Sequence, residues 1–184
     1  MTELDLLAFE LSVSGRTLRR AAGRGAIRAA REGERRVQVS DSEADYLRAY
    51  WPLLSALIAE LRTLPDVRLA VVFGSAARGE LYEQSDLDLL IRFAHGGLES
   101  RSTLIDRLEE ASRRTIQLVA FDETLAAPLL LADVLRDGRV LVDRDGDWPR
   151  LKRRERLIQR EAAAAEARLS EEIRTELREL GAVG

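Results

Sequence analysis

Two aspartates separated by a single residue give the clearest chemical signal in the chain. Asp86 and Asp88 lie at the start of an apolar run that ends at Phe93. We expect this run to form a β-strand, in which residues two positions apart point to the same face. Side-by-side carboxylates repel each other unless a cation lies between them. The pair therefore favours Mg²⁺, which binds a few protein oxygens and leaves its other positions to substrate phosphates.

A glycine-containing turn precedes the two aspartates. Residues 67–73 are apolar apart from Arg68 and include three β-branched valines, which predicts a buried strand, and Gly74-Ser75 follow it directly. Glycine lets the backbone approach a ligand closely, and free N–H groups at a strand-to-helix turn can bind phosphate oxygens. Ser75 adds a hydroxyl, and Arg78 adds a cation that can pair with phosphate. The pattern predicts a phosphate-binding turn close to a cation site.

Together these residues resemble the signature of the DNA polymerase β-type nucleotidyltransferase superfamily in its minimal bacterial form. The matching residues are Gly74-Ser75, Arg78-Gly79 and Ser85-Asp86-Leu87-Asp88-Leu89, and the resemblance covers roughly residues 65–147. It implies an α/β (α+β) fold in which a mixed sheet is flanked by helices. It also implies that Asp86 and Asp88 are catalytic metal ligands, and that the nucleotide is bound by Gly74, Ser75, Arg78 and Ser85. The cofactor implied is Mg²⁺ or Mn²⁺, and the substrate a nucleoside triphosphate, ATP being the one we expect.

The third carboxylate of this family pattern has no obvious counterpart here. The family usually places it on a neighbouring strand, and the matching segment is Arg114–Phe121, with Gln117 at the catalytic position. Glutamine offers an amide oxygen but cannot take up a proton. Asp122 faces the other way on a regular strand, although a bulge could bring it round, and Asp122 or Glu123 could act from the loop. The other interpretation is that catalysis is weak or lost while nucleotide binding survives.

Composition excludes several other kinds of site. The chain has 184 residues, 46% of them hydrophobic and 33% charged, no cysteine, one histidine and a net charge of -3. Thiol nucleophiles, disulfides and Cys- or His-rich metal sites are therefore excluded. No apolar run reaches the ~18–20 residues of a membrane helix, and no basic segment opens the chain. We expect a soluble cytoplasmic protein without a membrane partner, in which His95 is a loop residue of no special role.

The net charge conceals a strongly basic segment near the N-terminus. Residues 16–36 contain eight arginines and only two acids, Glu32 and Glu34. A local positive stripe of this kind matters more than total charge when the partner is a phosphate backbone. The candidate DNA-binding residues are the arginines of its first half, Arg16, Arg19, Arg20 and Arg24.

The spacing of apolar residues in this region predicts two short helices joined by a tight turn. Leu7 and Leu11 are one turn apart on the first helix, and Leu18 and Ala22 on the second. Ser14 is a suitable N-cap for the second helix, and Gly23 or Gly25 would end it. A β-ribbon should follow, with strands at 26–30 and 35–39 and a turn at 32–34.

This segment resembles the helix-turn-helix of many bacterial regulators, followed by a small wing. The resemblance covers about 40 residues, and it implies that the second helix presents its arginines to DNA. The other interpretation is a small helical cap whose arginines are merely solvated.

Four parts are expected along the chain: 1–40 as the helix-turn-helix with its wing, 41–64 as a connecting helix, 65–147 as the nucleotidyltransferase domain, and 148–184 as a C-terminal helix. Asp41 or Ser42 should cap the connecting helix. Further helices are predicted over 98–113 and 125–135, and a strand over 139–142.

The C-terminal helix should begin at Trp148 and carry a long apolar stripe, formed by Leu151, Ile158, Ala162, Ala165, Leu169, Ile173, Leu177 and Leu180. At ~1.5 Å per residue it spans roughly 45 Å, which one domain of this size rarely covers. We therefore expect part of it to pair with another chain, giving a homo-oligomer. The alternative is a helix that lies wholly on its own domain.

Two functions fit these observations. The first is Mg²⁺-dependent transfer of a nucleoside monophosphate to a hydroxyl, on a protein or an RNA. Proteins that resemble this chain act as antitoxins that modify a partner toxin, as toxins that modify RNA, or as drug-modifying enzymes. The second is a DNA-binding transcriptional regulator whose nucleotidyltransferase fold is catalytically weak or inactive. The two are compatible in an antitoxin that represses its own operon.

Overall fold

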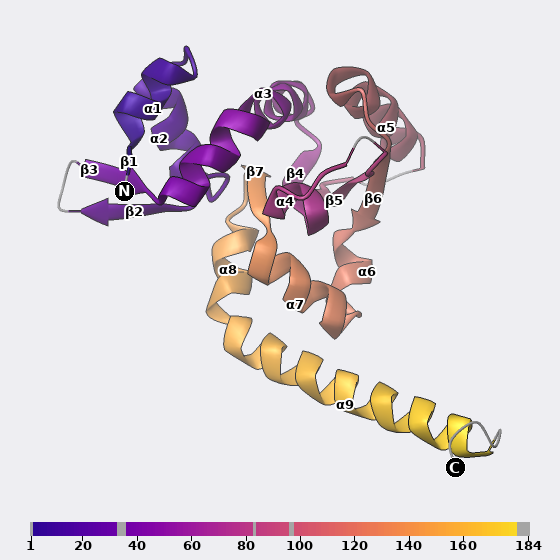
Figure 1. Ribbon diagram of the computed structural model, residues 1–184. Coiled ribbons are helices and arrows are strands. Elements are labelled where there is room, and N and C mark those ends of the chain that lie inside the picture. The colour runs from indigo at the N-terminus through magenta and orange to yellow at the C-terminus, as the bar shows by residue number, and fades with distance from the viewer. Residues whose placement is uncertain (1, 33–35, 83, 96–97, 180–184) are drawn as a thin grey trace.

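The computed structural model describes residues 2–32, 36–82, 84–95 and 98–179 (Figure 1). Its N-terminal part contains β1 (Thr2–Glu3), α1 (Leu4–Glu10), α2 (Gly15–Arg24), β2 (Ala29–Glu32), β3 (Arg36–Val39) and α3 (Asp41–Thr63). The central part contains β4 (Val67–Phe73), α4 (Gly74–Arg78), β5 (Leu87–Phe93), α5 (Leu98–Ser112) and β6 (Ile116–Ala120). The last part contains α6 (Phe121–Leu125), α7 (Pro128–Asp137), β7 (Arg139–Asp143), α8 (Asp147–Arg153) and α9 (Glu155–Glu179).

The central sheet is mixed, as the family resemblance implies. Its strand order is β6-β5-β4-β7, with β4 antiparallel to both β5 and β7 and β5 parallel to β6. Side chains alternate between the two faces, so Leu89 joins one buried cluster with α3 and α5 while Leu90 joins another with α7, α8 and α9. Helices thus cover both faces of the sheet, and the predicted α/β fold with flanking helices is confirmed.

The N-terminal part forms two short helices and a small sheet of order β1-β3-β2. Ser14 caps α2 as predicted, because its hydroxyl accepts from the backbone N–H of Thr17 at 3.1 Å. Gly25 ends α2 with φ +94°, a left-handed conformation that suits glycine. These helices pack on α3, and one continuous apolar cluster runs from Leu4 to the central sheet.

The first strand of the predicted β-ribbon needs correction. It is Ala29–Glu32 rather than 26–30, because Ala26 and Ile27 are buried in the core. The second strand is found at Arg36–Val39. Residue 35 of that predicted strand, and residues 33–34 of the predicted turn, lie outside the described residues. The sequence did not predict β1, a strand of only two residues, or its pairing with β3.

The cap of the connecting helix also differs from the prediction. Ser40, rather than Asp41 or Ser42, is the N-cap of α3, and its hydroxyl accepts from the N–H of Glu43 at 3.1 Å. All three residue types cap helices well, so the sequence alone did not separate neighbouring positions.

Two predicted helices differ from those in the structure. The helix predicted over 125–135 begins instead at Pro128, as α7, and Leu125 is the last residue of the preceding helix α6. Proline disfavours a helical conformation at the residue before it, which explains the late start of α7. The helix predicted from Trp148 is divided at Arg154 into α8 and α9. Trp148 and Leu151 are buried beside β7 while Ile158 is buried against α7, so the chain changes direction between them. Among the described residues, no helix is long and apolar enough to cross a membrane.

Candidate functional site

The turn between β4 and α4 strongly favours glycine at position 74. Gly74 has φ +67°, a left-handed conformation that other residues rarely adopt. A side chain at this position would also collide with the Asp88 carboxylate. The sequence Phe73-Gly74-Ser75 therefore places the backbone of the turn directly against an acidic side chain.

Asp88 is held between two neighbouring strands. It lies on β5 opposite Phe73 of β4 and beside Gln117 of β6. Asp86 lies immediately before β5, which begins at Leu87, so the prediction that both aspartates belong to the strand is wrong for Asp86. Asp86 is exposed and Asp88 is half-buried.

The carboxyl of Asp88 is electrostatically strained. Burial and the neighbouring negative charge of Asp86 raise its pKa above the ordinary value, and Arg78 opposes them. The influence of Asp86 indicates that the two carboxylates are close enough to repel each other. A cation bound between them would relieve both penalties, so this donor pair fits a hard metal ion such as Mg²⁺ that takes its other ligands from phosphates and water.

Arg78 lies beside the pair and is held by two other acids. Its Nε donates to Glu80 at 2.8 Å and a terminal nitrogen donates to Asp137 at 3.1 Å. These two carboxylates raise the pKa of Arg78, which stays positively charged. The geometry places a fixed cation next to Asp88.

The loop before Asp86 is organised by two polar residues. The Ser85 hydroxyl accepts from the N–H of Tyr82 at 2.9 Å, closing a tight turn. Arg114 donates to the carbonyls of Tyr82 at 2.8 Å and Ser85 at 3.3 Å. Sequence reasoning missed Arg114, whose only signal was its place before the strand that carries Gln117. The carbonyl of Ser75 accepts from Glu80, which closes α4.

Gln117 of β6 lies opposite Asp88 of β5, and its assignment to the place of the third carboxylate stays a prediction. Gln117 is exposed and in register with Asp88 on the parallel strand, so both point to the same face. Asp122 and Glu123 do not replace it, because they lie in α6, beyond the end of β6 remote from Gln117. Gln117 is the second residue of β6, whereas Asp122 follows the last residue of that strand, Ala120, by two positions. Within the described residues no group of three potential metal-binding side chains occurs.

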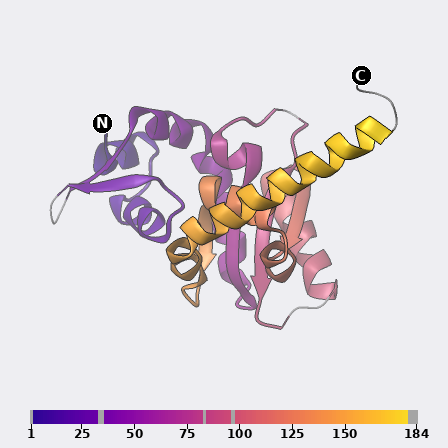
Figure 2. The same cartoon turned by 90° about the horizontal axis from the view of Figure 1, so that it is seen from below.

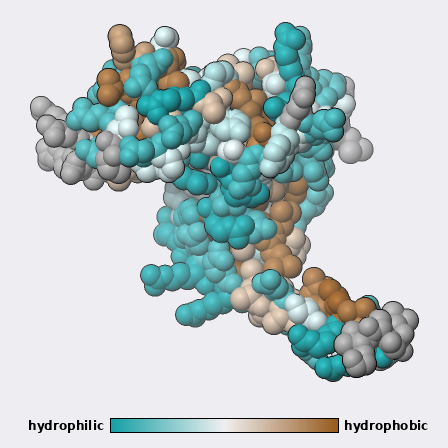
Figure 3. Space-filling model, in the orientation of Figure 1, coloured by the Kyte–Doolittle hydropathy of each residue, from teal (hydrophilic) through white to brown (hydrophobic). Residues whose placement is uncertain are grey.

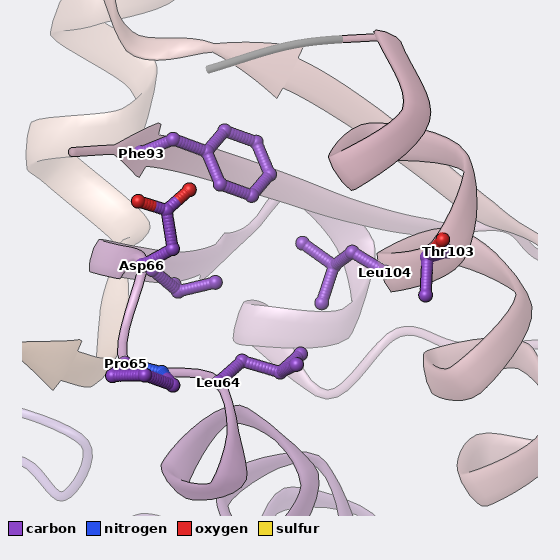
Figure 4. Close-up of a pocket in the computed structure, with 7 residues that line it drawn as sticks. Leu64, Pro65, Asp66, Phe93, Thr103 and Leu104 are labelled. Carbon is purple, nitrogen blue, oxygen red and sulfur yellow. The ribbon is translucent and has the colours of Figure 1, made fainter. Parts of the chain in front are cut away.

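A separate cavity lies at the opposite end of the sheet. It encloses about 330 Å³ and is lined by residues that include Leu64, Asp66, Phe93 and Leu104 (Figure 4). Its wall includes Val67, where β4 begins, whereas Gly74 follows the end of that strand. This cavity is therefore not part of the Gly74–Asp88 site. His95 contacts Asp66 through its backbone N–H at 3.0 Å and is otherwise exposed.

The four candidate DNA-binding arginines are in different environments. Arg16 and Arg20 are exposed on α2 and have no ion-pair partner in the described part of the chain. Arg19 pairs with Asp5 of α1. Arg24 is partly buried, and burial lowers its pKa, as do the nearby arginines. Among the described residues, Arg16 and Arg20 are therefore the members of this set that are both exposed and without an ion-pair partner.

Comparison with known proteins gives a family and a set of similar folds. A family model described as Polymerase beta, Nucleotidyltransferase matches residues 55–147. The chain is similar to a toxin-antitoxin structure with AMP-PNP, at 22% identity and TM-score 0.47, covering 69% of this chain and 97% of that one. It is similar to the toxin-antitoxin MntA-HepT, at 20% identity and TM-score 0.43, covering 70% and 96%. It is also similar to a tri-AMPylated Shewanella oneidensis HEPN toxin in complex with MNT antitoxin, at 20% identity and TM-score 0.43, covering 70% and 95%. No curated protein sequence matches the chain.

Proposed function

Because the chain belongs to the polymerase beta nucleotidyltransferase family, we propose that it transfers a nucleoside monophosphate from a nucleoside triphosphate to a hydroxyl and releases pyrophosphate. The observation that carries this proposal is the close approach of the Gly74 turn to Asp88, whose carboxylate also feels the neighbouring charge of Asp86. The proposed nucleotide-binding residues are Gly74, Ser75, Arg78 and Ser85, and the proposed metal ligands are Asp86 and Asp88.

Each residue has a proposed part in the reaction. The N–H groups of the Gly74-Ser75 turn bind phosphate oxygens, and Arg78 adds positive charge beside them. Asp86 and Asp88 would hold Mg²⁺, which would supply positive charge to neutralise the triphosphate during transfer. The acceptor oxygen forms a bond to the α-phosphorus while the bond to the pyrophosphate oxygen breaks.

Among the described residues, this site has no obvious base to take the proton of the acceptor hydroxyl. Gln117 orients groups through its amide but takes no proton, so the proton leaves to water or to a departing phosphate oxygen. We therefore propose that transfer is slow compared with that of relatives carrying a third carboxylate. The proposed acceptor is a hydroxyl of a partner toxin protein or of an RNA.

Substitution of the aspartates tests this function. Asp86→Asn and Asp88→Asn should each abolish incorporation of label from an α-labelled nucleoside triphosphate into cell extract, because amides bind Mg²⁺ poorly. Asp122→Asn is the matched control and should keep wild-type transfer. Transfer that survives in both site variants would show that the site is misassigned.

A second candidate function is DNA binding by α2 and the strands that follow it, in a transcriptional regulator whose transferase site is weak. The specific observation in its favour is the unpaired charge of Arg16 and Arg20 on the exposed face of α2. Each contact between an arginine and a DNA phosphate releases counterions. Loss of one such contact should therefore reduce the slope of log binding constant against log salt concentration by about one.

Duplex binding at several salt concentrations tests this candidate. The Arg16→Gln, Arg20→Gln double variant should bind more weakly and with a shallower salt dependence than wild type. Arg48→Gln is the control, because Arg48 is engaged by Glu10 and Asp45. Absence of duplex binding by the wild-type protein at low salt would eliminate this function.

A further inference from the structure

A buried ion pair lies beneath α4, between the N-terminal part and the central sheet. Arg139 begins β7 and is 1% exposed, and Glu43 of α3 is 4% exposed. The two terminal nitrogens of Arg139 donate to the two carboxylate oxygens of Glu43, at 2.6 Å and 2.9 Å. Burying two charges is costly unless every polar group is satisfied, so the remaining contacts of this pair show what it holds in place.

The same arginine reaches the backbone of α4. Its Nε donates to the carbonyl of Ala77 at 2.8 Å, and its guanidinium lies over the Tyr46 ring, 3.5 Å from the ring centre. The hydroxyl of Tyr46 in turn donates to the carbonyl of Ala76 at 3.0 Å. The Ala76 carbonyl otherwise accepts only a long bond from the N–H of Gly79, at 3.4 Å, among the described residues. The donors from Arg139 and Tyr46 therefore fix the orientation of α4 from below.

The pair also holds the segment that leads from α2 to β2. Glu43 accepts from the backbone N–H of Arg28 at 2.9 Å, and Arg139 donates to the carbonyl of Ala26 at 3.3 Å. A second connection runs through Asp137, whose carbonyl accepts from Arg28 and whose carboxylate accepts from Arg78. The N-terminal part and α4 are thus tied to the same few groups.

We propose that Tyr46 and Arg139 are positioning residues for the Gly74–Arg78 segment, and that Glu43 makes the N-terminal part a structural component of the nucleotide site. This inference rests on the proposed function, because it assigns α4 to the nucleotide. Affinity for the triphosphate then depends on donors supplied by α3 and β7, which do not touch the ligand.

The state of Tyr46 supports this role. Burial raises the pKa of Tyr46 to about 12, so the phenol remains protonated and donates to Ala76 throughout the physiological range. Tyr50 stacks on Tyr46 with ring centres 4.8 Å apart and is half-buried, which makes it a matched aromatic control.

Equilibrium binding of AMP-PNP in the presence of Mg²⁺ tests the inference. Tyr46→Phe removes the bond to Ala76 and leaves the ring, and it should raise the Kd about three- to tenfold, the usual worth of one buried hydrogen bond. Where transfer is measurable, the same change should appear in KM more than in kcat. Tyr50→Phe should stay within about twofold of wild type under the same conditions.

A core variant separates positioning from general destabilisation. Leu57→Ala shortens a buried apolar side chain of α3, which has no group that could donate to the carbonyls of α4. It should lower the Tm without changing the Kd. Equal affinity of Tyr46→Phe and Tyr50→Phe would overturn the inference, as would a matching loss in Leu57→Ala. If wild-type protein binds no AMP-PNP, the proposed function itself fails and the inference fails with it.

Discussion

Gly74 and Asp88 constrain each other across the turn. The left-handed conformation of Gly74 excludes other residues, and the Asp88 carboxylate fills the space that a side chain would need. Burial and Asp86 raise the pKa of Asp88, so this carboxylate gives up its proton at a higher pH than an exposed aspartate does. Metal binding at this pair should therefore weaken as the pH falls toward the raised pKa.

Replacement of Gly74 by alanine separates collision from backbone strain. Gly74→Ala should abolish nucleotide binding, because its methyl group displaces Asp88 or the turn. Gly146→Ala is the matched control: Gly146 has φ +73°, but the space around it is open. That variant should lose only about 1 kcal/mol of stability and keep nucleotide binding. Retained nucleotide affinity in a folded Gly74→Ala protein would contradict the close contact.

Restoring an acid at Gln117 tests the missing carboxylate. Gln117→Asp places a carboxylate beside Asp88, where it can bind metal and favour loss of the acceptor proton. We expect transfer to rise by about a hundredfold in steady-state assays, the lower end of the range for general-base catalysis. Gln117→Asn is the neutral control and should not raise the rate. Vigorous transfer by wild type, with no gain in Gln117→Asp, would show that no third carboxylate is required.

Gly74 and Asp88, which the sequence singled out, lie against each other in the structure, whereas the arginines that support the site were not predicted. The spacing of Gly74, Asp86 and Asp88 is local, and the strand pattern placed Gln117 in register. Arg114 and Arg139 act through backbone carbonyls far away in sequence, and arginines without a neighbouring motif give no such signal. Contacts of this kind depend on how the elements pack, so they were found only in the structure.

The elements themselves were predicted where apolar periodicity and turn residues agree. Strands β4 and β7 and helices α3 and α5 lie close to their predicted bounds. Errors arose where two signals compete: Ser40 against its neighbours for the cap of α3, and Pro128 within an apolar run. The division between α8 and α9 follows from tertiary packing of Trp148 and Ile158 and has no clear local signal.

The turn after β7 is joined to the central sheet by ion pairs, which predicts a pH-dependent stability. Asp145 accepts from Arg68 of β4 and from Arg92 of β5. Hydrogen bonds from Arg68 and then Arg92 hold the pKa of Asp145 well below its ordinary value, despite some desolvation. A lowered pKa means that this carboxylate stabilises the folded state above its ordinary pKa and loses that contribution as the pH falls further.

Thermal unfolding of Asp145→Asn should show this dependence. The variant should have a lower Tm than wild type near neutral pH, and the difference should shrink once the pH falls below about 4. Asp133→Asn is the control, because its pair with Arg136 is largely exposed and should contribute little. A difference in Tm that is constant from pH 7 to pH 3 would contradict the ion-pair origin.

On the scale of the molecule, α9 extends well beyond the domain that it covers. Ile158 and Ala162 are buried against α7, whereas Leu169, Ile173 and Leu177 are 39–49% exposed on the continuation of the helix. Figure 2 shows α9 crossing below the sheet and passing its edge, and Figure 3 shows apolar residues gathered on its distal half. An exposed stripe of this kind is typical of an interaction surface.

The homo-oligomer predicted from the sequence would form through this exposed stripe of α9. Ile173→Asp should shift the protein toward monomer in sedimentation experiments, because it places a charge in the middle of the apolar stripe. Thr175→Asp, on another face of the helix, is the control and should leave the association unchanged. A wild-type protein that is monomeric at every concentration tested would contradict the homo-oligomer.

The most direct test of the central claim is equilibrium binding of AMP-PNP to wild-type protein and to Asp88→Asn, each with and without Mg²⁺. We predict that wild type binds only when Mg²⁺ is present, and that Asp88→Asn loses at least about tenfold in affinity while keeping its fold. Binding that is absent in wild type, or equal in the two proteins, would contradict a nucleotide site at Gly74 and Asp88.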